Sequence, residues 1–179
     1  MATVNLLPNG TSSNDWTLST GLAANLLLDE DFGGSIGVDA SRLTATSGGA
    51  DVIVSMDDFT EDFFKINSVQ LVTRAGNNVR STTFELHTRL MNGTAGDFYD
   101  EYSGTVAASI GYRTQTYTER TTSDGSAGWT NTNLNDILVR VTLASISAGT
   151  VSFTYCYVIV DYTPLVSTAD NAVFFGTNF

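Results

Sequence analysis

Two stretches in the last third of the chain carry apolar or aromatic residues at every second position, as β-strands with one buried face do. They span residues 137–143 and 151–162, and the pattern holds at the odd-numbered positions as far as Ile159. We therefore expect the odd-numbered side chains of both strands to line one face of a sheet. The short link from Ser145 to Gly149, rich in Ser and Ala, predicts a hairpin connection between them.

Shorter segments of the same kind occupy much of the remaining chain, and turns rich in Gly and Asn separate them. The clearest are residues 52–56, 66–74 and 83–91. Single helical turns are expected near residues 57–65 and 131–135, but no segment carries a sustained apolar stripe with the 3.6-residue period of a helix. About eight strands between such turns predict an all-β fold, an antiparallel β-sandwich of jelly-roll type.

The expected organisation is one domain with an extended arm at each end. Residues 1–14 are polar apart from one Leu-Leu-Pro and are interpreted as an N-terminal arm. Residues 15–164 form the predicted jelly-roll domain, with Trp16 as an early anchor of the core. Residues 165–179 lack strand periodicity and are interpreted as a C-terminal arm.

The apolar residues of the two arms are the strongest candidates for a partner contact. The C-terminal cluster either folds back on its own domain or is buried against a partner, and we favour a partner because two or three phenylalanines can anchor a contact. A smaller contribution is expected from the N-terminal arm. The predicted docking residues are Leu6, Leu7, Val173, Phe174, Phe175 and Phe179.

The charge of the chain argues against several classes of partner. The net charge is −11, from eight basic and nineteen acidic residues, so neither nucleic acid nor an anionic membrane is an expected partner. The N-terminus has no basic start and no long apolar run, so we expect no signal peptide and synthesis in a cytoplasm.

The few cysteine and histidine residues limit metal binding and catalysis. Cys156 is the one cysteine and is expected to pack as a small apolar residue. His87 is the one histidine, alternates with Glu85 and Arg89, and is expected to face solvent on a strand. We expect no enzymatic activity, metal or other cofactor, although the acidic run of residues 29–31, followed by a Gly-Gly pair, has the oxygen ligands that calcium prefers.

A ribbon of alternating polar and aromatic residues runs from Tyr112 to Thr122 and has no apolar face, so it is predicted to be an edge strand or a solvent-facing ribbon. We expect it to form an oligomer interface through Tyr112, Thr114, Thr116 and Tyr117. The tyrosines near Trp129 also suggest a platform on which sugars stack, but packing in the core and at the rim of a trimer is the favoured interpretation. The tyrosines considered are Tyr99, Tyr102, Tyr112 and Tyr117.

Two segments resemble a pattern found in small virion proteins of tailed bacteriophages. In residues 128–141, Trp129-Thr130 is followed by the turn Asn133-Leu134-Asn135 and then by a core strand. Residues 66–75 are similar to a strand that precedes this pattern in those proteins. The resemblance implies a jelly-roll protein of the virion, usually trimeric, that serves as a capsid decoration (cement) protein or as a tail or fibre component without enzymatic activity.

Two functional hypotheses follow from these observations. In the first, a homotrimer docks on the major capsid protein and stabilises the phage head. In the second, the chain is a tail, spike or fibre domain that binds carbohydrate on the host surface.

Overall fold

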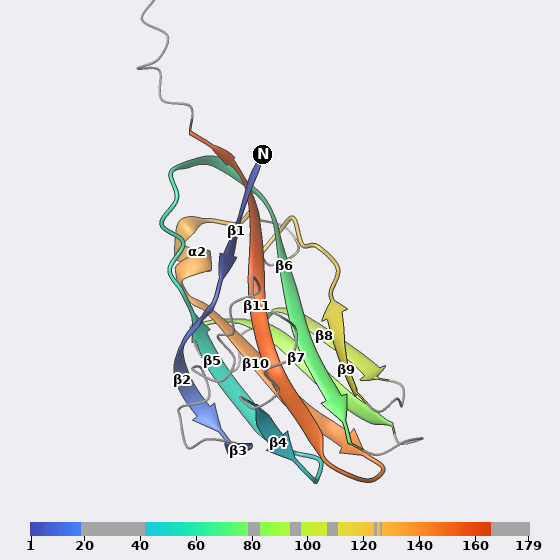
Figure 1. Ribbon diagram of the computed structural model, residues 1–179. Helices are drawn as coiled ribbons and strands as arrows, with labels where there is room; N and C mark the ends of the chain where they lie inside the picture. Colours follow the sequence, from blue (N-terminus) through green and yellow to red (C-terminus); the bar gives the residue numbers. More distant parts are fainter. Residues whose placement is uncertain are drawn as a thin grey trace, which may run out of the picture.

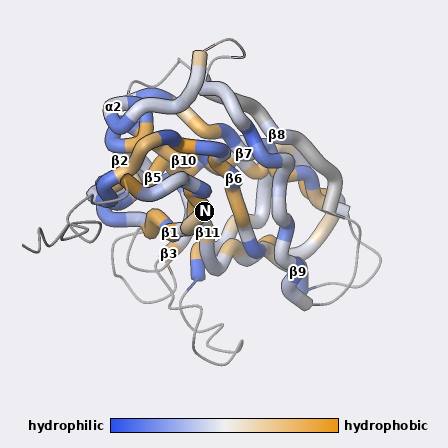
Figure 2. The backbone as a smooth tube through the Cα atoms, turned by 90° about the horizontal axis from the view of Figure 1, so that it is seen from above, coloured by the Kyte–Doolittle hydropathy of each residue, from blue (hydrophilic) through white to orange (hydrophobic). Residues whose placement is uncertain are grey.

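The computed structural model describes residues 1–18, 42–78, 83–93, 98–106, 111–123, 125 and 127–165. These residues form two antiparallel sheets that pack face to face (Figure 1). The predicted antiparallel β-sandwich of jelly-roll type is therefore confirmed. In the view of Figure 2, β10 and β7 lie in one layer and β11 and β9 in the other.

The first sheet, here called sheet A, contains the two longest strands of the molecule, which pair with each other. In spatial order it consists of β3 (Thr17–Leu18), β4 (Leu43–Ala45), β11 (Val151–Pro164), β6 (Phe63–Asn77) and β9 (Gly111–Thr116), with β1 (Ala2–Leu6) also paired to β11. Sheet B consists of β2 (Pro8–Asn14), β5 (Asp51–Met56), β10 (Ile137–Ile146), β7 (Phe84–Asn92) and β8 (Phe98–Val106).

The two strands with the clearest periodicity lie in the middle of the two sheets. Strand β10 pairs with β5 and β7, whereas β11 pairs with β6 along its length. Central positions were predicted for both strands and are confirmed. The predicted hairpin between them is wrong, because β10 belongs to sheet B and β11 to sheet A. The link passes from one sheet to the other and turns at Gly149, whose φ is 89°.

The alternation of β11 changes phase along the strand. Val151 and Phe153 are buried, as predicted, but from Cys156 onward the even-numbered residues are buried. The pairing with β6 shifts between Phe153 and Tyr155, so one extra residue of β11 lies in a β-bulge. Such an insertion exchanges the two faces of a strand. The prediction that Tyr155 and Ile159 share a face with Phe153 is therefore wrong, and they point away from the core.

The N-terminal residues belong to the sandwich instead of forming an arm. Residues 2–6 pair with β11, and residues 8–14 pair with β5. Leu6 is 2% exposed and lies in the core, so it is not available for docking on a partner, and Leu7 is half-buried. The interpretation of residues 1–14 as an arm is wrong because β1 pairs with part of the β11 edge. The docking residues predicted beyond residue 165 lie outside the described residues.

The core packs the two sheets through aromatic and aliphatic side chains. Trp16 lies 6.1 Å from Phe153, ring centre to ring centre, which confirms its predicted role as a core anchor. Cys156 is fully buried, also as predicted. The predicted turn at 131–135 is helix α2 (Asn131–Asn135), which buries Leu134 in the core.

Helix α2 owes its start to Thr130. The Thr130 side chain accepts a hydrogen bond from the Asn133 backbone, and the Asn133 side chain accepts one from the Thr130 backbone, so the two residues form a capping box. The other helical turn, predicted within residues 57–65, does not form. Residues 57–62 are irregular, and β6 begins at Phe63.

The burial of Leu6 leads to a prediction about stability. Leu6→Ala removes buried methyl groups from the core, so the free energy of unfolding should fall by about 2–5 kcal/mol in urea titrations. Thr3→Ala, on the exposed face of the same strand, should change it by less than about 0.5 kcal/mol. Equal stability of the two variants would show that β1 is not part of the folded core.

Candidate functional site

The outer face of sheet A carries a mixed aromatic and polar surface. Side chains from β1, β11, β6 and β9 project from it away from the core. Its rows follow from strand register: Asn5 pairs with Ile159, which pairs with Gln70. Two residues further along these strands, Tyr157 of β11 pairs with Val72 of β6, which in turn pairs with Thr116 of β9. Four strands therefore supply one continuous surface of side chains in fixed order.

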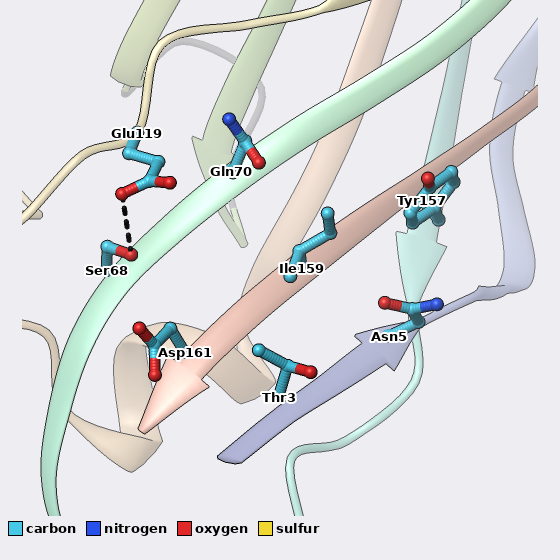
Figure 3. Close-up of a pocket in the computed structure, with 8 residues that line it drawn as sticks. All are labelled: Thr3, Asn5, Ser68, Gln70, Glu119, Tyr157, Ile159 and Asp161. Carbon is cyan, nitrogen blue, oxygen red and sulfur yellow. Dashed lines mark hydrogen bonds between the residues drawn. The ribbon is translucent and has the colours of Figure 1, made fainter. Parts of the chain in front are cut away.

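A groove of about 390 Å³ lies over three of these strands and the segment after β9. Strand β11 runs along its middle, with β1 on one side and β6 on the other (Figure 3). The lining is polar apart from one isoleucine and one tyrosine ring. The lining residues are Thr3, Asn5, Ser68, Gln70, Glu119, Tyr157, Ile159 and Asp161.

Hydrogen bonds hold several of these polar groups in place. The Gln70 side-chain amide donates to the Tyr117 backbone carbonyl at 2.8 Å. The Ser68 hydroxyl donates to a Glu119 carboxylate oxygen at 3.5 Å, and the Asn67 amide donates to Asp161 at 3.2 Å. Most of these side chains project from paired strands and are hydrogen-bonded to defined neighbours, so a ligand that bound here would cost little side-chain conformational entropy.

An aromatic cluster adjoins the groove toward β9. It consists of Tyr112, Tyr155, Tyr157 and Arg74, here called the tyrosine cluster. The rings of Tyr155 and Tyr157 lie 6.1 Å apart. The Arg74 guanidinium lies 5.5 Å from the ring centre of Tyr112 and 5.9 Å from that of Tyr155, within the range of cation–π contacts. The three tyrosines are half-buried, so part of each remains open to solvent.

Tyr157 belongs to both the groove and the cluster. Burial, and secondarily the neighbouring Tyr155, raise the pKa of the Tyr157 hydroxyl above its ordinary value. The hydroxyl is therefore neutral at physiological pH and can both donate and accept a hydrogen bond.

The residues predicted as an oligomer interface divide between two environments. Tyr112, Thr114 and Thr116 lie on β9, and within the described residues β9 pairs with β6 alone, so the predicted edge position is confirmed. They share the outer face of sheet A with the tyrosine cluster, since a Thr114–Tyr155 hydroxyl contact spans 2.9 Å. Tyr117 turns inward instead, and its hydroxyl lies 2.7 Å from that of Thr88 in the other sheet.

The predicted sugar platform is not assembled as expected. Trp129 is 5% exposed and Tyr102 is 6% exposed, so neither presents a ring face to solvent. The Trp129 indole donates to the Arg120 carbonyl at 2.9 Å, and Tyr102 packs against Tyr117 with ring centres 4.6 Å apart. The favoured interpretation of these rings as packing residues fits their burial, and the side chain of Tyr99 lies outside the described residues.

Tyr155 and Tyr157 were not predicted to be surface residues. Their odd-numbered positions assigned them to the core, and the bulge beside Thr154 reverses that assignment. One signal was present in the sequence: four consecutive residues, Tyr157 to Val160, are large and apolar or aromatic, so a simple inside–outside alternation does not fit them.

The remaining titratable candidates lie elsewhere. His87 projects from the outer face of sheet B with Glu85, whose carboxylate is 3.1 Å from the His87 Nε2, as expected for a solvent-facing strand residue. Among the described residues there is no group of three or more His, Cys, Asp or Glu side chains able to hold a metal ion. The acidic run at residues 29–31 lies outside that part of the chain.

Within the same part of the chain, no helix is long and apolar enough to cross a membrane. A scan against protein-family models and a search of curated proteins find no match.

Solved structures with a related arrangement of strands include two carbohydrate-binding modules and an adhesin domain. The CBM32 module of AlyQ, in complex with 4,5-unsaturated mannuronic acid, has a TM-score of 0.45 and 16% identity over 88% of this chain and 93% of its own. The CBM36-1 domain of a multidomain xylanase from the hindgut metagenome of Trinervitermes trinervoides has a TM-score of 0.44 and 5% identity over 92% and 100%.

The K1 cleaved adhesin domain of Lys-gingipain from Porphyromonas gingivalis W83 has a TM-score of 0.42 and 12% identity over 91% of this chain and 99% of its own. Values this low do not indicate a shared function. A function for the outer face of sheet A must therefore be argued from its own side chains.

The raised pKa of Tyr157 can be measured. In a titration followed by NMR of assigned Tyr ring carbons, the Tyr157 ring should ionise above the ordinary value of about 10, as should the buried Tyr162. Tyr155→Phe should lower that pKa, because it removes the neighbouring phenolate charge but leaves the burial. Because the folded-state pKa exceeds the unfolded one, the associated stability is present below about pH 10 and is lost as pH rises further. An unchanged Tyr157 pKa in Tyr155→Phe would contradict the contact.

Proposed function

We propose that this chain is a non-enzymatic domain that binds carbohydrate on the outer face of sheet A. The observation that carries this proposal is the junction of the half-exposed tyrosine cluster with the polar groove. Sugar rings have apolar C–H faces and a rim of hydroxyls, so they need an aromatic surface together with hydrogen-bonding side chains. Tyr157 lies where the two surfaces meet.

The construction of the site supports binding more than chemistry. Its side chains come from paired strands, which keeps the spacing between aromatic and polar groups fixed. The amides of Asn5 and Gln70, together with hydroxyls and carboxylates, offer donors and acceptors to the hydroxyls of a sugar. Nucleophilic catalysis through Cys156 is disfavoured, because burial raises the pKa of this thiol and keeps it away from solvent.

The direct test is the loss of glycan binding when the rings are removed. Tyr157→Ala and Tyr155→Ala should each weaken binding to the best ligand of a glycan array by at least about tenfold, equivalent to about 1.4 kcal/mol, as measured by titration calorimetry. The matched control is His87→Ala, which removes a half-buried ring from the outer face of sheet B. Equal binding by all three variants, or no bound glycan, would reject the proposal.

A second candidate function is attachment to a larger particle such as a phage virion, where the partner would be the major capsid protein. Phe64 is 76% exposed and Leu165 is 59% exposed, at the end of sheet A where β11 finishes. Thr163 pairs with Lys65 and Pro164 with Phe63, so Phe64 is the extra residue at the last of the three register shifts between β6 and β11. A β-bulge can change the direction in which a side chain points. Here Phe63 packs against the core, whereas its neighbour Phe64 points to solvent.

This second function predicts that Phe64→Ser reduces co-sedimentation with particles of the encoding phage several-fold, because apolar burial at the contact is lost. Lys65→Ser, the exposed neighbour, should leave occupancy near the wild-type level. The associated oligomer is expected to be a homotrimer in light scattering. Equal decoration with and without Phe64 would reject Phe64 as the contact, whereas wild-type protein that does not co-sediment with the particles would reject this function and leave the glycan proposal unaffected.

A further inference from the structure

Two carboxylates stand at the end of the groove farthest from the tyrosine cluster. Asp161 pairs with Ser68 across the β11–β6 ladder. Glu119 approaches Ser68 from the other side, where its carboxylate accepts the 3.5 Å hydrogen bond. Figure 3 shows both acidic side chains on the same surface of the sheet, beside Ser68. A ligand that covers this row meets two negative charges.

The groove lining contains no residue of opposite charge. Its other members are neutral: two amides, two hydroxyls, one isoleucine and one tyrosine. Arg74, on the same face, stands between Tyr112 and Tyr155 in the tyrosine cluster and does not line the groove. The net charge of −11 adds a potential of the same sign over the whole molecule.

We propose that this groove selects glycans by charge, and that Glu119 and Asp161 determine the selection. The inference rests on the proposed function. Glycans without a negative charge bind, whether neutral or amine-bearing, whereas uronic acids, sialic acids and sulfated sugars are excluded by repulsion. The physical reason is that an acidic sugar placed over the Ser68 row would have to desolvate its carboxylate beside two like charges.

The preference for uncharged over acidic glycans can be measured with one glycan prepared in different charge states. The neutral glycan that binds best on an array is compared with the same glycan after oxidation of its primary alcohols to carboxylates, and with an amine-bearing counterpart. At low salt, the acidic form should bind at least about tenfold more weakly than the neutral parent. The difference should shrink when salt rises to about 1 M, where the Debye length is about 3 Å.

The double variant Glu119→Gln/Asp161→Asn keeps the shape of the groove and removes both charges. It should reduce the neutral-to-acidic preference by at least about fivefold, because the acidic form gains affinity relative to the neutral form once the like charges are removed. The matched control is Glu85→Gln/Asp57→Asn, which changes the net charge by the same amount outside the groove and should preserve the preference.

The outcomes separate the two proposals. If wild-type protein binds no glycan of any charge, the proposed function fails and the selectivity fails with it. If it binds neutral and acidic forms equally, or if both double variants change the preference alike, carbohydrate binding stands and the role of Glu119 and Asp161 is overturned.

Discussion

The pairing of β6 with β11 determines most of what this molecule presents to its surroundings. The two strands form the longest ladder of the sandwich, and its register shifts at three places. Each shift changes which side chains point to the core. The register shift beside Thr154 places Tyr155 and Tyr157 on the outer face of sheet A. The register shift at Thr163 leaves the side chain of Phe64 exposed to solvent. Both candidate functions therefore depend on departures from regular pairing within one pair of strands.

The strand content and the central strands could be predicted from the sequence because alternation reports directly on a buried face. In β10 the odd-numbered residues from Ile137 to Leu143 are buried without interruption, as the pattern predicts. In β11 the same rule fails after Phe153, since a bulge leaves no signature in composition. Alternation also says nothing about which sheet a strand joins, so the hairpin expected between β10 and β11 was an error of topology.

The candidate site was harder to predict because it is made of residues distant in sequence. Asn5, Gln70 and Ile159 become neighbours only through register, and a single sequence does not encode register visibly. The edge position of β9 was predicted from its lack of an apolar face. The sequence did not reveal that Tyr112 points outward whereas Tyr117 points inward. Tyr117 bonds across to Thr88, and this contact depends on the spacing between the two sheets. The N-terminal segment was wrongly predicted to be an arm, because the five residues of β1 are too few to show a clear two-residue alternation.

Strand β1 completes the groove with Thr3 and Asn5 and also covers part of the edge of β11. Without it, the backbone N–H and C=O groups of β11 between Val158 and Tyr162 would lie open, and an open edge is a template for pairing with another chain. The first six residues thus both line the groove and protect the edge of β11 against pairing with another chain. A purification tag at the N-terminus would therefore sit beside the rim of the groove, next to Thr3 and the paired end of β11.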